Sequence, residues 1–268
     1  MSVNHPVLGR LATAAGSRPK RSLFWAFRRL LFGPHSDRRL IRYRLGEIAA
    51  AWIGRCWVSE DLKLWLQDEQ FLSDYRRFSP RNLRSAERKF AVRELVRSLA
   101  EIPGDTAECG AYQGATSYFI CRERCRGPHH VFDSFAGLSS PGAEDLPDHA
   151  RVAAWQAGDL AAAEDVARRN LAKFPWVRFY RGWIPTRFLE VADRTFCFVH
   201  IDVDLYLPTR ESLEFFYPRL ARGGMIVCDD YGFANCLGAK RACDEFVAAV
   251  REPLIHWPTG QALLIRRG

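Results

Sequence analysis

The chain has 268 residues, and 48% of them are hydrophobic, which is enough for one large domain or one domain with an added module. No apolar run approaches the roughly 20 residues that cross a bilayer. The formal net charge is +8, and residues 1–50 account for all of it, with ten Lys and Arg against Asp37 and Glu47. Because a nucleic-acid enzyme more often carries positive charge around its cleft, this distribution argues against a nucleic-acid partner.

Residues 1–35 form a basic segment that we expect to be partly disordered. Within it, residues 21–32 place aromatic and leucine side chains beside Arg28 and Arg29 and predict an amphipathic helix that ends at Gly33-Pro34. Such a helix can lie on an anionic membrane surface, or it can pack on the domain or on a second subunit of a homo-oligomer. The Arg-rich, acid-poor start also resembles an organelle transit peptide.

Eight cysteines are scattered along the chain without a CxxC pair, so their spacing does not indicate a zinc site. Cys109, Cys197 and Cys228 fall inside predicted buried strands, where a free cysteine behaves as a small hydrophobe. This usage indicates a reduced, cytoplasmic compartment.

Residues 36–104 are predicted to be a helical cap or lid region. Ser36 and Ser59 are candidate N-caps, and a further helix is expected from about Leu83 to Leu99. The Pro103-Gly104 pair ends that helix.

From residue 105 the pattern changes to short apolar runs that alternate with helical stretches, which is typical of βαβ units and a mostly parallel sheet. The tight turn 258–260 predicts that the last two strands form an antiparallel hairpin. The expected strands lie near 106–109, 129–132, 177–181, 196–201, 224–229, 252–257 and 261–266. The expected helices lie near 115–125, 159–173, 209–221 and 238–250.

Two apolar runs end abruptly in carboxylates. Residues 198–206 carry Asp202 and Asp204, and residues 225–231, which follow a predicted Gly-Gly turn, carry Asp229 and Asp230. Since ligands collect beyond the carboxyl ends of parallel strands, we expect these four side chains around one crevice. Clustered carboxylates suit a hard cation such as Mg²⁺, Ca²⁺ or Mn²⁺. Single Asp residues are alternatively helix N-caps, which does not explain an adjacent pair.

Three further patterns are weak when each is taken alone. A glycine-bearing turn, Gly110–Gly114, follows the first strand and lets a ligand approach the backbone. Asp133 ends the second strand, where an acid hydrogen-bonds ribose hydroxyls, although it could instead cap the next turn with Ser134. Trp183 can wall a ring pocket or belong to the core. His200 shares the face of Asp202 by strand alternation, and we interpret it as a packed core histidine.

The motifs in combination resemble the macrocin/mycinamicin/novobiocin-type sugar O-methyltransferases, over roughly residues 84–250. The first motif is also similar to that of catechol O-methyltransferase, a more distant metal-dependent relative. The motifs are Glu108-Cys-Gly-Ala-Tyr-x-Gly-x-Thr116, Asp133-Ser-Phe-x-Gly-Leu138, Gly182-Trp183, Asp202-Val-Asp204-Leu-Tyr206, Tyr217-Pro-x-Leu-x-x-Gly-Gly224 and Val227-x-Asp229-Asp230-Tyr231-Gly232.

The resemblance implies a class I methyltransferase (Rossmann-like) sheet of seven strands in residues 105–268, with S-adenosylmethionine and Mg²⁺ as cofactors. It assigns the binding of S-adenosylmethionine to Glu108, Gly110, Ala111, Tyr112, Gly114, Thr116, Asp133, Ser134, Gly182 and Trp183. Within this set Thr116 meets the methionine carboxylate, Asp133 the ribose, and Gly182 and Trp183 the adenine. It assigns the metal to Asp202, Asp229 and Asp230, with Asp202 also the candidate general base.

One departure concerns the base. Where catechol O-methyltransferase has a lysine three residues after its first metal-binding Asp, this chain has Leu205, so Asp202 or Asp204 must take the proton. Asp204 is either an acceptor behind the site or the cap of a helix beginning at Pro208. The loop from Gly137 to Trp155 is long enough to cover an acceptor. We therefore expect methyl transfer to a sugar hydroxyl in a natural product or glycan; alternatives are a catechol-like diol as acceptor, or a non-catalytic nucleoside-binding or membrane-surface adaptor.

Overall fold

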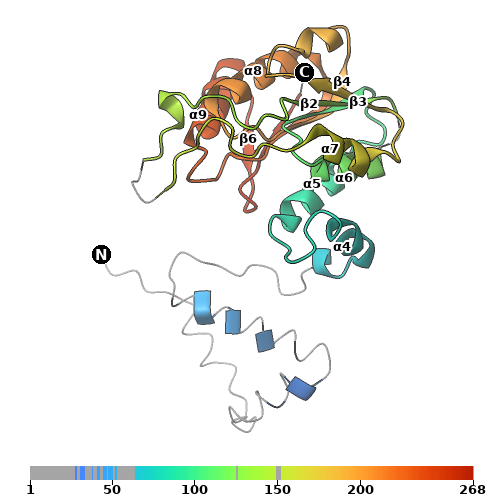
Figure 1. Ribbon diagram of the computed structural model, residues 1–268, viewed down its shortest axis with the longest axis vertical. Helices are drawn as coiled ribbons and strands as arrows, with labels where there is room; N and C mark the ends of the chain where they lie inside the picture. The colour runs from blue at the N-terminus through green and yellow to red at the C-terminus, as the bar shows by residue number, and fades with distance from the viewer. Residues whose placement is uncertain are drawn as a thin grey trace. The chain divides into compact units, whose positions relative to one another are not determined.

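The computed structural model describes residues 64–124, 126–148 and 152–267, and isolated positions between residues 28 and 52 (Figure 1). The chain divides into two compact units, Met1–Gln67 and Asp68–Gly268, and the second holds all seven strands. The candidate caps Ser36 and Ser59 and most of segment 21–32 lie outside the described residues. Among the described residues, no helix is both long and apolar enough to span a bilayer.

Seven strands form one sheet in the order β3-β2-β1-β4-β5-β7-β6. Strands β1 to β5 are parallel, whereas β7 runs antiparallel to both β5 and β6, which confirms the predicted C-terminal hairpin. The strands are β1 (Asp105–Cys109), β2 (His129–Asp133), β3 (Val177–Arg181), β4 (Phe196–Ile201), β5 (Leu220–Cys228), β6 (Leu254–His256) and β7 (Ala262–Ile265).

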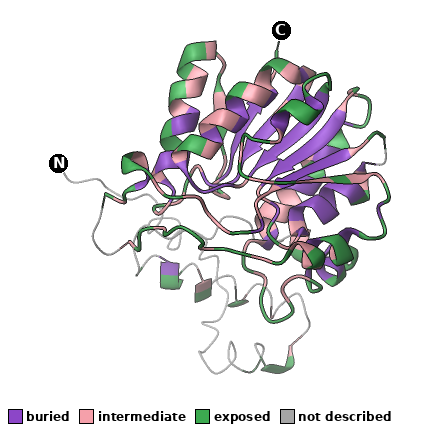
Figure 2. Ribbon diagram, turned by 45° about the horizontal axis from the view of Figure 1, so that its top comes forward, coloured by how far each residue is buried: buried purple, intermediate pink, exposed green. Residues whose placement is uncertain are grey.

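Helices cover both faces of this sheet, and Figure 2 shows the buried strands enclosed by helices whose outer sides are exposed. Helix α5 contacts α6, and α8 contacts α9. The helices of the second unit are α4 (Glu69–Tyr75), α5 (Ala86–Ser98), α6 (Ala115–Glu123), α7 (Glu164–Leu171), α8 (Tyr206–Phe216) and α9 (Leu237–Val250). Short 3₁₀ turns are η1 (Leu64–Leu66) in the first unit and η2 (Ala143–Asp145), η3 (Phe188–Val191) and η4 (Tyr217–Arg219) in the second.

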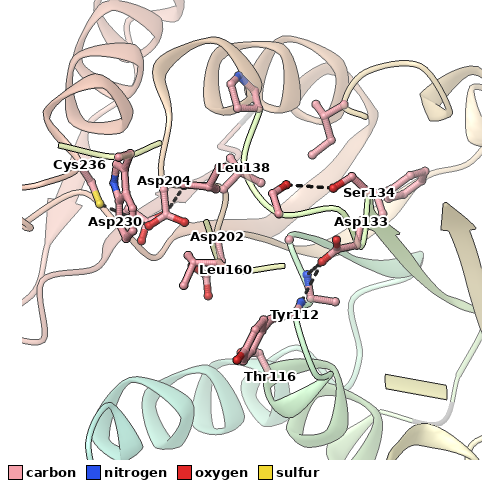
Figure 3. A pocket seen from close by; sticks show the side chains of 18 of the residues that line it. Tyr112, Thr116, Asp133, Ser134, Leu138, Leu160, Asp202, Asp204, Asp230 and Cys236 are labelled. Atoms are coloured by element: carbon pink, nitrogen blue, oxygen red, sulfur yellow. Dashed lines mark hydrogen bonds between the residues drawn. The ribbon is translucent and has the colours of Figure 1, made fainter. Parts of the chain in front are cut away.

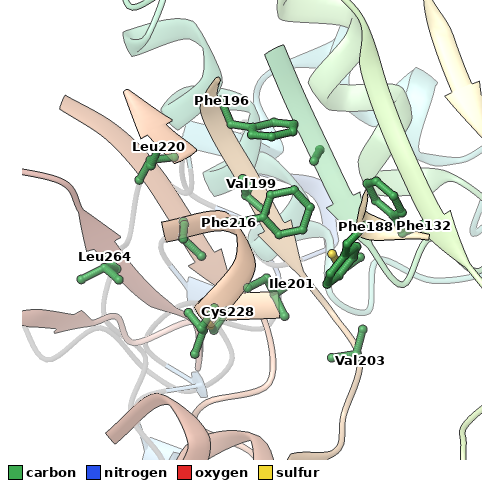
Figure 4. Close-up of a cluster of buried hydrophobic side chains, with 14 of the residues drawn as sticks. Phe132, Phe188, Phe196, Val199, Ile201, Val203, Phe216, Leu220, Cys228 and Leu264 are labelled. Atoms are coloured by element: carbon green, nitrogen blue, oxygen red, sulfur yellow. The ribbon is translucent and has the colours of Figure 1, made fainter. Parts of the chain in front are cut away.

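Each face of the sheet has its own hydrophobic core because side chains alternate along a strand. In β4, Val199 joins a core with Phe216 of α8 (Figure 4), whereas Phe198 joins Val92 of α5 and Ile120 of α6. The strand is therefore apolar on both sides, which is why it appears in the sequence as a continuous hydrophobic run.

Two local predictions need correction. The sequence predicts a turn at Gly223–Gly224 before β5, but the pair lies inside β5, where the pairing jumps from Phe196↔Leu220 to Phe198↔Met225. Helix α8 begins at Tyr206, earlier than predicted, because the Asp145 carboxylate, from a distant loop, accepts the Tyr206 backbone N–H at 2.7 Å. Asp204 is therefore not the cap of this helix.

Candidate active site

A cavity of about 630 Å³ lies beyond the carboxyl ends of the parallel strands. Strand β1 is the place where the chain order reverses, with β2 on one side and β4 on the other. Such a switch point is where open α/β sheets bind ligands, because the loops after neighbouring strands diverge there. The loops after β1, β2 and β4 contribute Gly110, Asp133 and Asp202 to the cavity wall.

One half of the cavity is built from backbone and glycine. Gly110 has a φ of +82°, and a Cβ there would lie 1.8 Å from the Asp202 carbonyl oxygen, so only glycine fits between the β1 and β4 loops. The Asp133 carboxylate accepts the backbone N–H groups of Ala111 at 2.7 Å and Tyr112 at 2.8 Å (Figure 3). The glycine-bearing turn is thus fixed from both sides.

Asp133 also caps the turn that follows β2, as the alternative interpretation of this residue predicted. Its Oδ1 accepts the Phe135 N–H at 2.7 Å and so caps the turn after β2. Burial raises the pKa of Asp133, and the three backbone N–H groups oppose that rise. Oδ2 accepts two of these N–H groups and Oδ1 only one, so Oδ1 keeps a lone pair for a ligand hydroxyl.

Most residues assigned to the cofactor border the cavity, but two do not. Glu108 is 1% exposed, and Gly114, at the start of α6, is next to α7, since a Cβ added there would meet Leu171. The predicted residues that line the cavity are Gly110, Ala111, Tyr112, Thr116, Asp133, Ser134, Gly182, Trp183, Asp202 and Asp230.

The other half of the cavity, called the acid half, is lined by charged side chains, namely Arg88, Lys89, Asp202, Asp204 and Asp230. Asp229 does not line it but pairs with Arg88 and Lys89. Its carboxylate is fully buried and faces four donors from three distant segments. Gln261 donates to Oδ1 at 2.7 Å, and His200 Nε2 lies 3.2 Å from the same oxygen. Arg88 donates to Oδ2, and Lys89 Nζ lies 3.7 Å from it. Burial would raise the pKa of Asp229, but Lys89, His200 and Arg88 hold it well below its usual value.

Asp202 lines the cavity and is the most exposed of the four strand-end carboxylates, with 27% of its side chain exposed. Lys89 Nζ lies 3.9 Å from its Oδ2. Burial and the charge of Asp229 raise the pKa of Asp202 to about 6, while Lys89 opposes the rise. Lys89 itself stays protonated, because Asp229 and Asp202 raise its pKa more than burial lowers it.

Asp204 and Asp230 form a second group together with Cys236. The Asp204 backbone N–H donates to Asp230 Oδ2 at 2.9 Å, and Cys236 Sγ lies 3.5 Å from Asp204 Oδ1. Burial and the charge of Asp202 raise the pKa of Asp204 to about 7, and burial with Asp204 raises that of Asp230 well above its usual value. Among the described residues, no Lys or Arg lies within ion-pair distance of Asp204 or Asp230, in contrast to Asp229.

His200 is buried, as predicted, but it connects charged groups instead of packing among apolar ones. Its Nδ1 lies 3.1 Å from Glu108 Oε1, and Ser117 donates to the other Glu108 oxygen. Burial would lower the pKa of His200, but its hydrogen bonds with Asp229 and Glu108 raise it to about 9. The histidine thus lies between two carboxylates under the cavity floor.

The predicted metal ligands are divided between two groups of side chains that could each hold one ion. The groups able to share one ion are His200, Asp202 and Asp229 on one side, and Asp204, Asp230 and Cys236 on the other, among the residues that the structure describes. Asp202 and Asp229 belong to the first group and Asp230 to the second, so a metal ion held by all three stays a prediction.

Sequence reasoning missed several side chains at the site. Arg88 and Lys89 come from α5, and Gln261 precedes β7; nothing local in their sequences indicates a site. Asp145 is also 5% exposed and fixes the loop over the cavity to the start of α8. That loop contributes Leu138, Ser139 and Trp155 to the cavity wall, as expected for a segment covering the acceptor.

The comparisons with known proteins agree on one family. The sequence profile of macrocin O-methyltransferase (TylF) matches residues 83–258. A tetracenomycin-type rhamnosyl 4'-O-methyltransferase of Streptomyces olivaceus is 30% identical over 148 residues, 52% of this chain and 57% of that protein. The demethyldecarbamoylnovobiocin O-methyltransferase of Streptomyces niveus is 29% identical over 172 residues, 59% of this chain and 64% of that protein.

The solved structure of the O-methyltransferase NovP is similar with a TM-score of 0.56 and 27% identity, over 68% of this chain and 81% of that one. The matches span less than two thirds of the length of the two curated relatives. The profile match covers more than half of the chain and includes every strand-end motif described above. The chain belongs to the macrocin O-methyltransferase family.

Proposed function

We propose that this protein transfers a methyl group from S-adenosylmethionine to a hydroxyl of a sugar in a natural product or glycan. The observation that carries the proposal is the cavity in which the Gly110–Asp133 half meets the Asp202 carboxylate. Family membership supports methyl transfer. By name, the relative from Streptomyces olivaceus methylates a rhamnosyl tetracenomycin, and the relative from Streptomyces niveus methylates demethyldecarbamoylnovobiocin.

The cofactor half suits S-adenosylmethionine in its shape and polarity. Gly110 leaves the backbone open, and the helix start at Ala115 offers free N–H groups near Thr116 for a carboxylate. Asp133 keeps a lone pair on Oδ1 for a ribose hydroxyl, and the half-exposed Trp183 offers a flat side for adenine. The resemblance implies each of these roles, and the residue type and its place on the cavity wall support it.

Asp202 is the residue that we assign to the proton transfer. In the reaction the acceptor oxygen forms a bond to the methyl carbon, the carbon–sulfur bond breaks, and the hydroxyl proton passes to a base. Asp202 faces the cavity and, with a pKa raised to about 6, is still mostly ionised at neutral pH while being a stronger base than a free carboxylate. Asp204 is more enclosed and its Oδ1 already contacts Cys236.

Magnesium held by Asp202, Asp229 and Asp230 stays a prediction, and this donor set fits it poorly. Asp229 is already surrounded by Arg88, Lys89, His200 and Gln261, so a metal ion would have to displace a protein donor. We therefore derive no catalytic step through a metal ion. Peripheral membrane contact through residues 21–32, and assembly into a homo-oligomer, likewise stay predictions.

The test is calorimetry with S-adenosylhomocysteine, followed by a screen of sugar glycosides and of catechol-like diols as acceptors. We expect saturable binding of S-adenosylhomocysteine and methyl transfer to a glycoside. Absence of binding would overturn the proposal, and transfer only to the diols would replace the sugar by the alternative acceptor class.

A further inference from the structure

In the acid half of the cavity, the ammonium group of Lys89 lies between two carboxylates, at a position where a metal ion could otherwise bind. It lies on α5, outside the strand-end loops, yet its Nζ is 3.9 Å from Asp202 Oδ2 and 3.7 Å from Asp229 Oδ2. The two oxygens belong to the loops after β4 and β5, and Lys89 bridges them. Only 12% of its side chain is exposed, although it borders the cavity.

The neighbouring contacts keep Lys89 in that position. Arg88, the preceding residue, donates to Asp229 and to Ser85, with its guanidinium 4.8 Å from the centre of the Phe233 ring. The backbone of α5 at this point also contacts the segment before β7, since the Arg88 carbonyl accepts from Gln261 at 3.5 Å. The helix start is thus fixed to the same carboxylate that Lys89 reaches.

Protein groups also occupy the remaining lone-pair positions of the Asp229 carboxylate. A carboxylate offers about four lone-pair positions, and His200, Gln261, Arg88 and Lys89 approach its two oxygens. A divalent ion between Asp202 and Asp229 would compete with an ammonium group for the same two oxygens. Two cations that share one pair of carboxylates repel each other strongly in a partly buried site.

We propose that Lys89 supplies, as part of the protein, the positive charge between Asp202 and Asp229 that a divalent ion would otherwise supply, so that methyl transfer needs no added metal. The inference rests on the proposed function for its catalytic part. A charge held in place before the reaction stabilises a developing alkoxide without reorganising. Lys89 borders the cavity next to the carboxylate that takes the proton, which is where that negative charge appears.

The first test is the binding of Mg²⁺ alone, measured by calorimetry on the full chain saturated with S-adenosylhomocysteine. Wild type is expected to show no saturable Mg²⁺ binding up to about 1 mM. Lys89→Met keeps the length of the side chain and removes its charge, so it should bind Mg²⁺ at least about tenfold more tightly, because a unit charge about 4 Å away is gone. Lys89→Arg keeps the charge and should behave as wild type.

Lys240→Met is the matched control, because Lys240 is also paired with a carboxylate, that of Asp244 at 2.5 Å, but on the outer side of α9. It should leave Mg²⁺ binding unchanged. Micromolar Mg²⁺ binding by wild type, or Mg²⁺ binding that Lys89→Met leaves equal or weaker, would overturn the inference. If Lys89→Met fails to fold, the wild-type titration still decides, since micromolar binding there contradicts the proposal.

The second test is methyl transfer by wild type in EDTA and in Mg²⁺. We expect less than a twofold difference, whereas a loss of more than tenfold in EDTA that Mg²⁺ restores would overturn the inference. The proposed function fails in a different way, by absence of S-adenosylhomocysteine binding, so the two failures are distinguishable.

Discussion

The two halves of the cavity are held in place by different kinds of interaction. Around Gly110 and Asp133 the donors are backbone N–H groups and the close approach is to a glycine, so the geometry follows from the course of the chain. Around Asp202 and Asp229 the partners are long side chains from α5, β4 and the segment before β7. The half around Gly110 thus depends on the local backbone conformation, whereas the half of clustered acids depends on cations from distant segments.

Asp202→Asn separates the two halves most sharply. The amide cannot take up the acceptor's proton, so the rate of methyl transfer should fall by about 10²–10⁴-fold, the usual contribution of a positioned base. Calorimetry should still find S-adenosylhomocysteine binding close to that of wild type, because the Asp202 side chain belongs to the acid half. Normal turnover would remove Asp202 from the mechanism, and lost binding would show that the halves are not independent.

His200→Gln tests how far the acid half depends on compensated charge. Glutamine is neutral, so it cannot replace the positive charge that His200 places between Glu108 and Asp229. Each of these buried carboxylates then loses one charged partner. We expect the free energy of unfolding to fall by about 3–5 kcal/mol, as for other broken buried ion pairs. Urea unfolding followed by circular dichroism measures it.

His129→Gln is the control for that variant. His129 is equally buried, but its ring contacts the hydroxyls of Thr106 and Ser117 at 2.8 Å each, and no carboxylate. Losing a bond between neutral groups should cost only about 1–3 kcal/mol. Equal costs for the two variants would contradict the view that charge compensation holds the acid half together.

The pH dependence of the free energy of unfolding should reveal the lowered pKa of His129. Burial lowers the pKa of His129 to about 4, whereas the same histidine in the unfolded chain titrates near 6.5. The unfolded chain therefore binds a proton first, and stability falls as the pH drops from about 6.5 towards 4, by on the order of 3 kcal/mol. Urea unfolding across this range should give a steeper slope for wild type than for His129→Gln, and identical slopes would contradict the assignment.

Gly110→Ala tests the backbone-built half. A Cβ at Gly110 would meet the Asp202 carbonyl oxygen, whereas a Cβ at Gly158, which has a similar φ of +87°, would have no atom within 4 Å. Both variants share the strain of a positive φ, so their difference isolates the collision. We expect Gly110→Ala to be about 1–3 kcal/mol less stable than Gly158→Ala and to bind S-adenosylhomocysteine more weakly. Equal stability and equal binding would show that the β1 and β4 loops can separate at no cost.

The family profile and the fold agree with what short-range patterns predict. Strand periodicity, glycine-bearing turns and acids at strand ends are local features, so they are sufficient to predict β1, β4 and the positions of Gly110, Asp133 and Asp202. The Gly223–Gly224 pair misled the prediction because a glycine pair is equally typical of a turn and of a bulge, and only the pairing of β5 with β4 decides between them.

The sequence by itself determined a parallel α/β sheet, its antiparallel hairpin and the carboxylates at its edge, because each depends on the order of a few neighbouring residues. Only the tertiary structure decided which of those carboxylates is neutralised. Arg88 and Lys89 are more than 100 residues from Asp202 and Asp229 in the chain, and Asp145 lies 61 residues before Tyr206, whose N–H it accepts. Which charged groups interact depends on their distance in the folded protein, and a local sequence pattern does not contain that distance.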